Sequence, residues 1–330
     1  MNTRRKLVIA LGASTLAPCA SFAQQKIYRL AILQLGNAES VRVREAALGQ
    51  GLKELGYFEG ANLAVDRRYA DGRAERLAAL AAELVKSRPD VICAPTTPAA
   101  HAVKEAAAAA AASSPVPIVI ISASDPVGSG FAASLARPGG NITGTTNMQT
   151  DLDAKRVQIL RELVPTLKRV GLVQAGDRLA QIQIAAAQVA GRVLGIDMVA
   201  LTAQQPDEYR REFATAKSGG IGAIVIVSNG QNTQHEKLII DLAAQHRLPA
   251  IYPETGRPER GGLISYGTDT NMLYKRAAFY VDKLFKGAKA AELPIEQPTQ
   301  FEIAVNLKTA KALGLKVPQS ILIQATKVIE

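Results

Sequence analysis

The 330-residue sequence contains no tryptophan, only two cysteines and three histidines, and no long apolar run. Two cysteines are too few for the disulfide framework that stabilises small secreted domains. No apolar stretch reaches the roughly 18–20 residues that a membrane-spanning helix needs. A 48% apolar content excludes wholesale disorder, and the length suggests two domains, each with its own core.

The sequence also lacks the common catalytic motifs. It has no Walker phosphate-binding loop, no G-x-S-x-G turn, and no G-x-G-x-x-G after the first predicted strand. His235 and Glu236 begin like a zinc-protease motif, but Ile239 stands where the second histidine ligand is required. Ser129 lies between two glycines without a recognisable catalytic partner. We therefore expect no catalytic residue, no metal and no cofactor.

An excess of basic residues is the most unusual feature of the composition. The net charge is +10, from 39 Lys and Arg against 29 Asp and Glu. Bases and acids are mixed along the predicted helices, and no aromatic ladder accompanies the tight basic pairs at 67–68 and 210–211. Nucleic-acid binding would need a basic stripe with stacking aromatics, so we expect no nucleic-acid partner.

Residues 1–23 have the features of a signal peptide. A basic tripeptide precedes a short apolar stretch, and Ser21 and Ala23 supply the small residues of a cleavage site. The paired arginines leave the Sec and twin-arginine routes both open, while Pro18 before Cys19 argues against a lipoprotein. Removal of this leader would leave 36 basic and 29 acidic residues, a net charge of +7 over 307 residues.

Short apolar runs alternate with helical patterns along the rest of the chain, and this alternation occurs twice. The first series has predicted strands at 27–33, 63–69, 91–94 and 116–122. The second has predicted strands at 169–174, 198–201, 221–228, 250–252 and 263–266, with a helix expected at 233–246. Strands and helices in this order predict an α/β fold with two doubly wound parallel sheets. The remaining cysteine, Cys93, falls in a buried strand and is expected to be an inert thiol.

The C-terminal segment is too short for a third domain and is expected to complete the other two. It contains a helical pattern at 272–285 and a strand near 301–305. We expect the chain to cross between the two lobes near 142–147, 266–270 and 296–300. The predicted lobes comprise residues 26–144 plus 269–297, and residues 145–268 plus 298–330.

The loops that follow the predicted strands contain the candidate binding residues, because ligands of open α/β sheets bind at the carboxyl ends of the strands. Hydroxyl and amide side chains beside helix N-termini are suited to holding a carboxylate. The alternative for these side chains is a role in helix caps and turns, and for Tyr252 burial in the core. The candidates are Asn37, Thr96, Thr97, Ser122, Ser124, Asp125, Asn147, Asp177, Asn229, Tyr252 and Glu254.

Five stretches resemble one protein family, and they cover the chain in order. They are residues 51–57, 125–130, 134–144, 261–267 and 296–314. Together they resemble the ABC transporter substrate-binding proteins of the branch that includes tryptophan-binding lipoproteins of Gram-positive bacteria. The resemblance implies a type I periplasmic-binding-protein fold, with two Rossmann-like lobes joined by three crossing segments and closing on a small molecule.

The same resemblance implies ligand contacts at Thr96 and Thr97 and in the loop with Ser122, Ser124 and Asp125. In the second lobe, residues 175–178 replace an Asn-Pro-rich loop that many members carry, so the resemblance leaves the ligand open. We expect a monomeric periplasmic receptor that delivers a small molecule, an amino acid or related carboxylate, to an ABC permease. The absence of tryptophan disfavours sugars.

Two other functions remain compatible with the sequence. The same lobes would serve a sensor that presents a ligand-dependent surface to a membrane signalling protein. An exported hydrolase with Ser129 as nucleophile is the other alternative, and it rests on little more than the predicted cleft.

Overall fold

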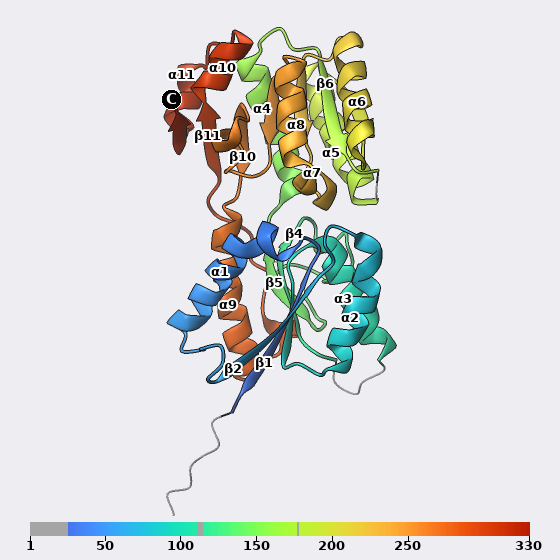
Figure 1. The fold of residues 1–330 in the computed structure, drawn as a ribbon, viewed down its shortest axis with the longest axis vertical. Helices are drawn as coiled ribbons and strands as arrows, with labels where there is room; N and C mark the ends of the chain where they lie inside the picture. The colour runs from blue at the N-terminus through green and yellow to red at the C-terminus, as the bar shows by residue number, and fades with distance from the viewer. Residues whose placement is uncertain (1–25, 111–114, 177) are drawn as a thin grey trace, which may run out of the picture.

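The structure is a computed structural model that describes residues 26–110, 115–176 and 178–330. The expected signal peptide, residues 1–23, lies outside the described residues. Two α/β lobes are stacked along the long axis of the molecule (Figure 1). Among the described residues, no helix combines the length and the apolar character that crossing a membrane requires.

The first lobe is built on a five-stranded sheet in which every pair of neighbouring strands is parallel. The strand order is β2-β1-β3-β4-β5, which is the doubly wound arrangement that the alternation of strands and helices predicts. The strands are β1 (Tyr28–Gln34), β2 (Leu63–Tyr69), β3 (Val91–Ala94), β4 (Ile118–Ala123) and β5 (Ile142–Thr146).

Helices cover both faces of this sheet. Successive residues of a strand point to opposite faces, so its buried apolar side chains need a helix layer on each side. Ile32 and Cys93 pack toward α1 (Ala38–Glu54) and α9 (Thr270–Phe285), whereas Leu33 packs toward the opposite face. That opposite face is covered by α2 (Leu77–Lys86), which follows the 3₁₀ turn Ala74–Arg76, and by α3 (Thr97–Ala109). Cys93 is buried, as expected, and burial raises the pKa of its thiol to about 12.

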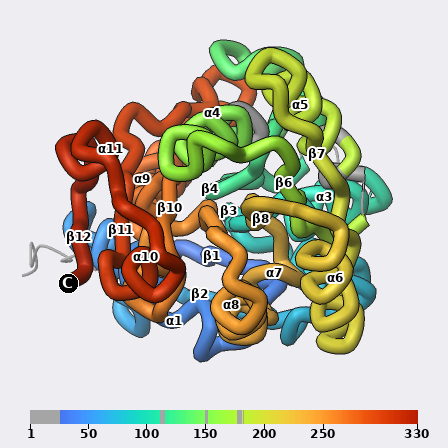
Figure 2. The backbone as a smooth tube through the Cα atoms, turned by 90° about the horizontal axis from the view of Figure 1, so that it is seen from above, coloured from blue at the N-terminus to red at the C-terminus, as the bar shows by residue number. Residues whose placement is uncertain are grey.

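The second lobe contains a seven-stranded sheet in the order β12-β11-β10-β9-β8-β6-β7, with β12 and β7 at its two edges (Figure 2). Its pairs are parallel except for β10 with β11, which are antiparallel, so the sheet is mixed at this edge. The short strand β12 was not predicted, because three residues carry no readable alternation. The strands are β6 (Arg169–Gln174), β7 (Asp197–Thr202), β8 (Ala223–Ile226), β9 (Ala250–Tyr252), β10 (Ile264–Gly267), β11 (Glu302–Asn306) and β12 (Lys327–Ile329).

The helices of the second lobe also form two layers. One core contains residues of α4 (Gln149–Leu163), α5 (Arg178–Leu194), α10 (Leu307–Leu313) and α11 (Gln319–Gln324). The other contains residues of α6 (Pro206–Ser218) and α8 (Glu236–Gln245). The prediction of one helix over 233–246 was wrong, because the chain breaks at His235 between the five-residue α7 (Gly230–Gln234) and α8.

The chain passes between the lobes three times, after β5, after β10 and before β11. The helix between the second and third passages, α9, lies against α1 in the first lobe although more than 200 residues separate them (Figure 1). The first and third passages are joined by backbone hydrogen bonds: Glu296 N donates to Gly144 O at 2.9 Å, and Thr146 N donates to Glu296 O at 3.0 Å.

A buried ion pair ties α4 to the second passage. Arg156 Nη1 donates to Asp153 Oδ1 at 2.5 Å, and neither side chain is exposed to solvent. Arg156 Nε also donates to the backbone oxygen of Tyr266 in β10 at 2.9 Å. A fully buried ion pair needs such additional hydrogen bonds to offset the loss of hydration. Here the bond from Arg156 also fixes Tyr266, near the end of β10, where the chain passes on to α9.

Candidate functional site

A cavity of about 260 Å³ lies between the lobes, and loops from both of them line it. This volume is just below the range that is usual for small-molecule sites, roughly 300–1,000 Å³. The cavity lies at the carboxyl ends of β1, β3 and β4 in the first lobe and of β8 and β9 in the second. This is the position at which open α/β sheets bind ligands.

Most of the sequence candidates meet in this cavity. Those that line it are Asn37, Thr96, Thr97, Ser122, Ser124, Asn147, Asn229 and Glu254. Asp125 does not line it, and its carboxylate accepts a hydrogen bond from Gly128 N at 2.8 Å within its own turn. Tyr252 lies in the core beneath the second-lobe wall, where it is 2% exposed. Asp177 lies outside the described residues.

The hydroxyl groups of the first lobe also hold the local backbone. Thr96 caps α3 by accepting from Ala99 N at 3.4 Å, and Thr97 Oγ1 accepts from Ser124 N at 3.3 Å. Ser122 Oγ donates to Pro95 O at 2.7 Å. A hydroxyl can donate one hydrogen bond and accept two, so Thr97 keeps its donor and Ser122 its acceptor capacity. Capping and ligand binding are therefore compatible roles here.

Helix α1 adds residues that the loop-based prediction did not include. Asn37 caps the helix by accepting from Ser40 N at 2.9 Å, and Ser40, Val41 and Arg44 line the cavity with it. Positions 37, 40, 41 and 44 share one helix face, a spacing that is visible in the sequence. No hydrogen-bond or ion-pair partner of the Arg44 guanidinium is found among the described residues, so a cation without a counterion borders the cavity.

Tyr274 enters the cavity wall from α9, far along the chain from the other first-lobe residues. Burial raises the pKa of its hydroxyl to about 12, and the hydroxyl donates to Gln34 Oε1 at 3.4 Å. Gln34 Nε2 in turn donates to Glu45 Oε1 at 2.9 Å. This chain of hydrogen bonds fixes the orientation of the Gln34 amide at the end of β1.

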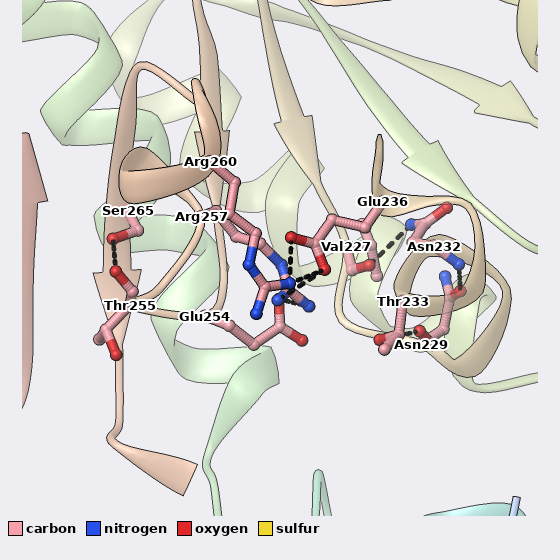
Figure 3. Close-up of polar contacts among 10 residues, drawn as sticks. All are labelled: Val227, Asn229, Asn232, Thr233, Glu236, Glu254, Thr255, Arg257, Arg260 and Ser265. Carbon is pink, nitrogen blue, oxygen red and sulfur yellow. Dashed lines mark hydrogen bonds and ion pairs between the residues drawn. The ribbon is translucent and has the colours of Figure 1, made fainter. Parts of the chain in front are cut away.

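The second-lobe wall contains Asn229 and Glu254 (Figure 3). Asn229 caps α7 by accepting from Asn232 N at 2.8 Å. Arg257 lies 3.3 Å from the Glu254 carboxylate and 2.8 Å from that of Glu236, and the Arg257 side chain is only 7% exposed (Figure 3). Because a buried guanidinium with two carboxylates has a fixed position, Arg257 holds Glu254 at the cavity wall.

A second, much smaller cavity lies behind this wall. Its volume of about 10 Å³ is close to that needed for one water molecule, and Thr233 and Glu254 line both cavities. The other polar residues around it include Glu236 and Arg257. The Glu254 carboxylate thus lies between the ligand-sized cavity and this ion-pair cluster.

Two glycines beside the cavity lie close to a side chain of the other lobe. A Cβ atom at Gly230 of the second lobe would lie 2.3 Å from Leu35 Cδ2 of the first. A Cβ atom at Gly72 of the first lobe would lie 2.4 Å from Gln234 Oε1 of the second. In each lobe a glycine therefore packs against a side chain of the other lobe. A larger residue at either position would push the two walls apart.

The cavity wall contains groups for binding but no recognisable catalytic set. It contains neither histidine nor cysteine, and Ser129, the candidate hydrolase nucleophile, is not part of it. Among the described residues, no group of three or more His, Cys, Asp and Glu side chains could hold a metal ion. What remains is a polar, two-walled site with hydroxyls, amides, one unpaired guanidinium and carboxylates.

Two α/β lobes with three crossing segments and a cavity between them define the type I periplasmic-binding-protein fold, as the sequence predicted. The family model of the ABC transporter substrate binding proteins matches residues 29–329. The chain therefore belongs to that family, whose members bind substrates for ABC transporters.

Individual relatives agree with this assignment. The tyrosine-binding protein of Clostridioides difficile (strain R20291) is 24% identical over 293 residues, which cover 88% of this chain and 82% of the relative. A conserved domain protein from Vibrio cholerae is 26% identical with a TM-score of 0.84, covering 92% of this chain and 100% of that one. An ABC domain from Streptococcus pneumoniae, solved with L-Trp, has the same fold at 22% identity and a TM-score of 0.83, with the same coverage.

Proposed function

We propose that this protein captures an α-amino acid or a closely related small carboxylate between its lobes and delivers it to an ABC permease. The observation that carries the proposal is the presence of both charges in the cavity wall: the Arg44 guanidinium on the first lobe, for which no counterion is found among the described residues, and the Glu254 carboxylate on the second, which also pairs with Arg257. A zwitterion presents a carboxylate and an ammonium group to complementary charges. Binding would therefore draw the two walls together.

The first-lobe wall supplies further groups that favour a carboxylate. The cavity reaches the N-terminus of α3, where backbone N–H groups and the positive end of the helix dipole favour an anion. Thr97 retains a free hydroxyl donor beside it, and Arg44 adds a full positive charge. The relatives named for tyrosine binding and solved with L-Trp support an amino acid as the ligand class.

The remaining parts of the proposal concern location and assembly. Residues 1–23 would direct export to the periplasm and be removed, and the mature monomer would bind its ligand and dock on the permease. Catalysis has no place in this scheme, because a receptor releases its ligand unchanged.

A thermal-shift screen of the mature chain, residues 24–330, tests the proposal. The panel contains the twenty L-amino acids, small carboxylates, purines and sugars. A ligand at 100 times its dissociation constant stabilises the native state by about 2.7 kcal/mol, which raises the melting temperature measurably. We expect an amino acid to give the largest shift, with calorimetry confirming one site per chain. A sugar or purine as the only binder would contradict the proposal.

A further inference from the structure

Two buried polar atoms in the cavity wall have no hydrogen-bond partner within the part of the chain that the structure describes. They are Asn147 Oδ1 and Asn229 Nδ2. Asn147 directly follows β5 at the first passage between the lobes, and Asn229 begins α7 in the second lobe. A buried polar atom without a partner has lost its water and gained nothing in exchange, so proteins rarely contain one without a reason.

The helix cap made by Asn229 shows which of its two amide atoms is the nitrogen. Its Oδ1 accepts from the backbone N–H of Asn232 at 2.8 Å, and an amide nitrogen could not take that place, because it has no acceptor capacity. The orientation of the amide is therefore set, and Nδ2 is the atom left over. Asn229 offers the cavity a hydrogen-bond donor.

The backbone at Asn147 is held by hydrogen bonds at and beside this residue. Its own N–H donates to Ala123 O at 3.2 Å, and the preceding Thr146 hydroxyl donates to the same oxygen at 2.6 Å. The following residue, Met148, has a φ of 50°, a left-handed conformation that is uncommon for a residue other than glycine. The side chain is 8% exposed, and its Oδ1 offers the cavity an acceptor.

The two amides come from different parts of the fold. Asn229 is next to Gly230, which meets Leu35 where the first lobe leads into α1, the helix of Arg44. Glu254 follows β9, the neighbour of the crossing strand β10, and Asn147 lies on another of the crossings. Asn229 is thus linked through Gly230 and Leu35 to the helix of Arg44, whereas Asn147 belongs to a crossing segment.

From this arrangement we infer that Asn147 and Asn229 are specificity-determining residues that require a ligand with a hydrogen-bond donor at one end and an acceptor at the other. Asn147 Oδ1 accepts from the ligand's amino group, and Asn229 Nδ2 donates to its carboxylate. The inference rests on the proposed function and adds a rule of exclusion: a molecule that lacks either group leaves a buried amide atom unpaired and is rejected.

The same substitution at both positions separates the two roles. Asn229→Asp keeps the cap, because Asp caps helices as well as Asn does, but replaces the donor with a negatively charged acceptor. Its affinity for the best amino acid of the screen should fall at least about 100-fold. Asn147→Asp keeps the acceptor and adds a charge that suits an ammonium group, so its affinity should stay within about threefold of native or increase.

Analogues that lack one end of the amino acid provide a second readout. If L-tyrosine is the best binder, the analogues are tyramine, without the carboxylate, and 3-(4-hydroxyphenyl)propanoate, without the ammonium group. Native protein should bind both at least about 30-fold more weakly than L-tyrosine. In Asn147→Ala the preference for L-tyrosine over the propanoate should shrink about tenfold, and in Asn229→Asp it should persist.

Gln158→Glu is the matched charge control, because Gln158 is exposed on α4 and its substitution adds the same negative charge away from the cavity. Melting curves without ligand show that each variant is folded. Equal weakening by both Asn→Asp variants, or an unchanged preference in Asn147→Ala, would overturn the inference while leaving the amino-acid receptor intact. Failure of the native protein to bind any amino acid would overturn the proposed function and this inference with it.

Discussion

Gly230 of the second lobe lies so close to Leu35 of the first that a Cβ atom at position 230 would be 2.3 Å from Leu35 Cδ2. The reciprocal arrangement occurs at Gly72 of the first lobe, where an added Cβ atom would lie against Gln234 Oε1 of the second. Both contacts lie beside the cavity and join residues that no local sequence pattern brings together. They define how closely the two walls of the site approach each other.

Gly230→Ala should weaken ligand binding without destabilising either lobe. The added Cβ forces Leu35 to move or the walls to part, and overpacking of this kind costs about 1–3 kcal/mol, so calorimetry should show affinity at least about fivefold lower. The double variant Gly230→Ala with Leu35→Ala should recover most of the lost affinity, because the smaller side chain leaves room for the added Cβ. Gly49→Ala is the control, because nothing lies within 4 Å of its Cβ. Native affinity in Gly230→Ala would mean that the ligand-bound lobes do not make this contact.

Arg44→Gln should lower affinity for carboxylate ligands about 10- to 100-fold, because the guanidinium borders the cavity and has no counterion within residues 26–110, 115–176 and 178–330. Arg42→Gln removes the same charge from the same helix, but Arg42 is exposed and pairs with Glu39. The Arg42→Gln variant should therefore bind the ligand with native affinity. Titration calorimetry of both variants decides between a specific contact and a general effect of net charge. Equal losses in the two variants would favour the latter.

Asp153→Asn should destabilise the fold by about 3–5 kcal/mol, because it removes the carboxylate partner of the fully buried Arg156. Replacing both residues, as in Asp153→Leu with Arg156→Met, should recover much of that loss, since a buried ion pair gains little over apolar side chains of similar volume. Urea unfolding measures both changes. A loss below about 1 kcal/mol in Asp153→Asn would show that the pair is not buried in solution.

Glu296 should contribute to stability at neutral pH and not in acid. The hydrogen bonds from Arg276 hold the pKa of this carboxyl below its ordinary value of 4.5, more than partial burial raises it. A carboxyl that binds its proton less tightly in the folded state stabilises fully above its unfolded pKa. That stabilisation is lost as the pH falls through the lower folded pKa.

Glu296→Gln should therefore reduce the free energy of unfolding at pH 7, by no more than about 1 kcal/mol because the pair is partly exposed. The difference from native should shrink as the pH falls below the ordinary carboxyl pKa of 4.5 and through the lower folded pKa. Glu292→Gln, at an exposed carboxyl 3.6 Å from Lys289, removes the same charge elsewhere on the surface and is the control. A Glu296→Gln difference that stays constant with pH would contradict the role of the ionised carboxyl.

Much of this structure could be predicted because its signals are local. The alternation of apolar runs with helical spacing gave the two doubly wound lobes, and the small polar residues after the strands gave most of the cavity wall. Tyr252 could not be placed in this way, because the same residue type suits both a strand end and the core beneath it. The break between α7 and α8 at His235 was missed because helical periodicity continues across it.

The sequence by itself determined the order of strands and helices, the loops at their carboxyl ends and the family, because periodicity, caps and motifs lie within short stretches of chain. Only the tertiary structure decided that α9 brings Tyr274 into the first-lobe wall. It also decided that, within the part of the chain that the structure describes, Arg44 borders the cavity without a counterion and Asn147 and Asn229 each keep one unpartnered atom. These features depend on how two lobes pack across three crossings, and such long-range packing leaves no local pattern in a sequence.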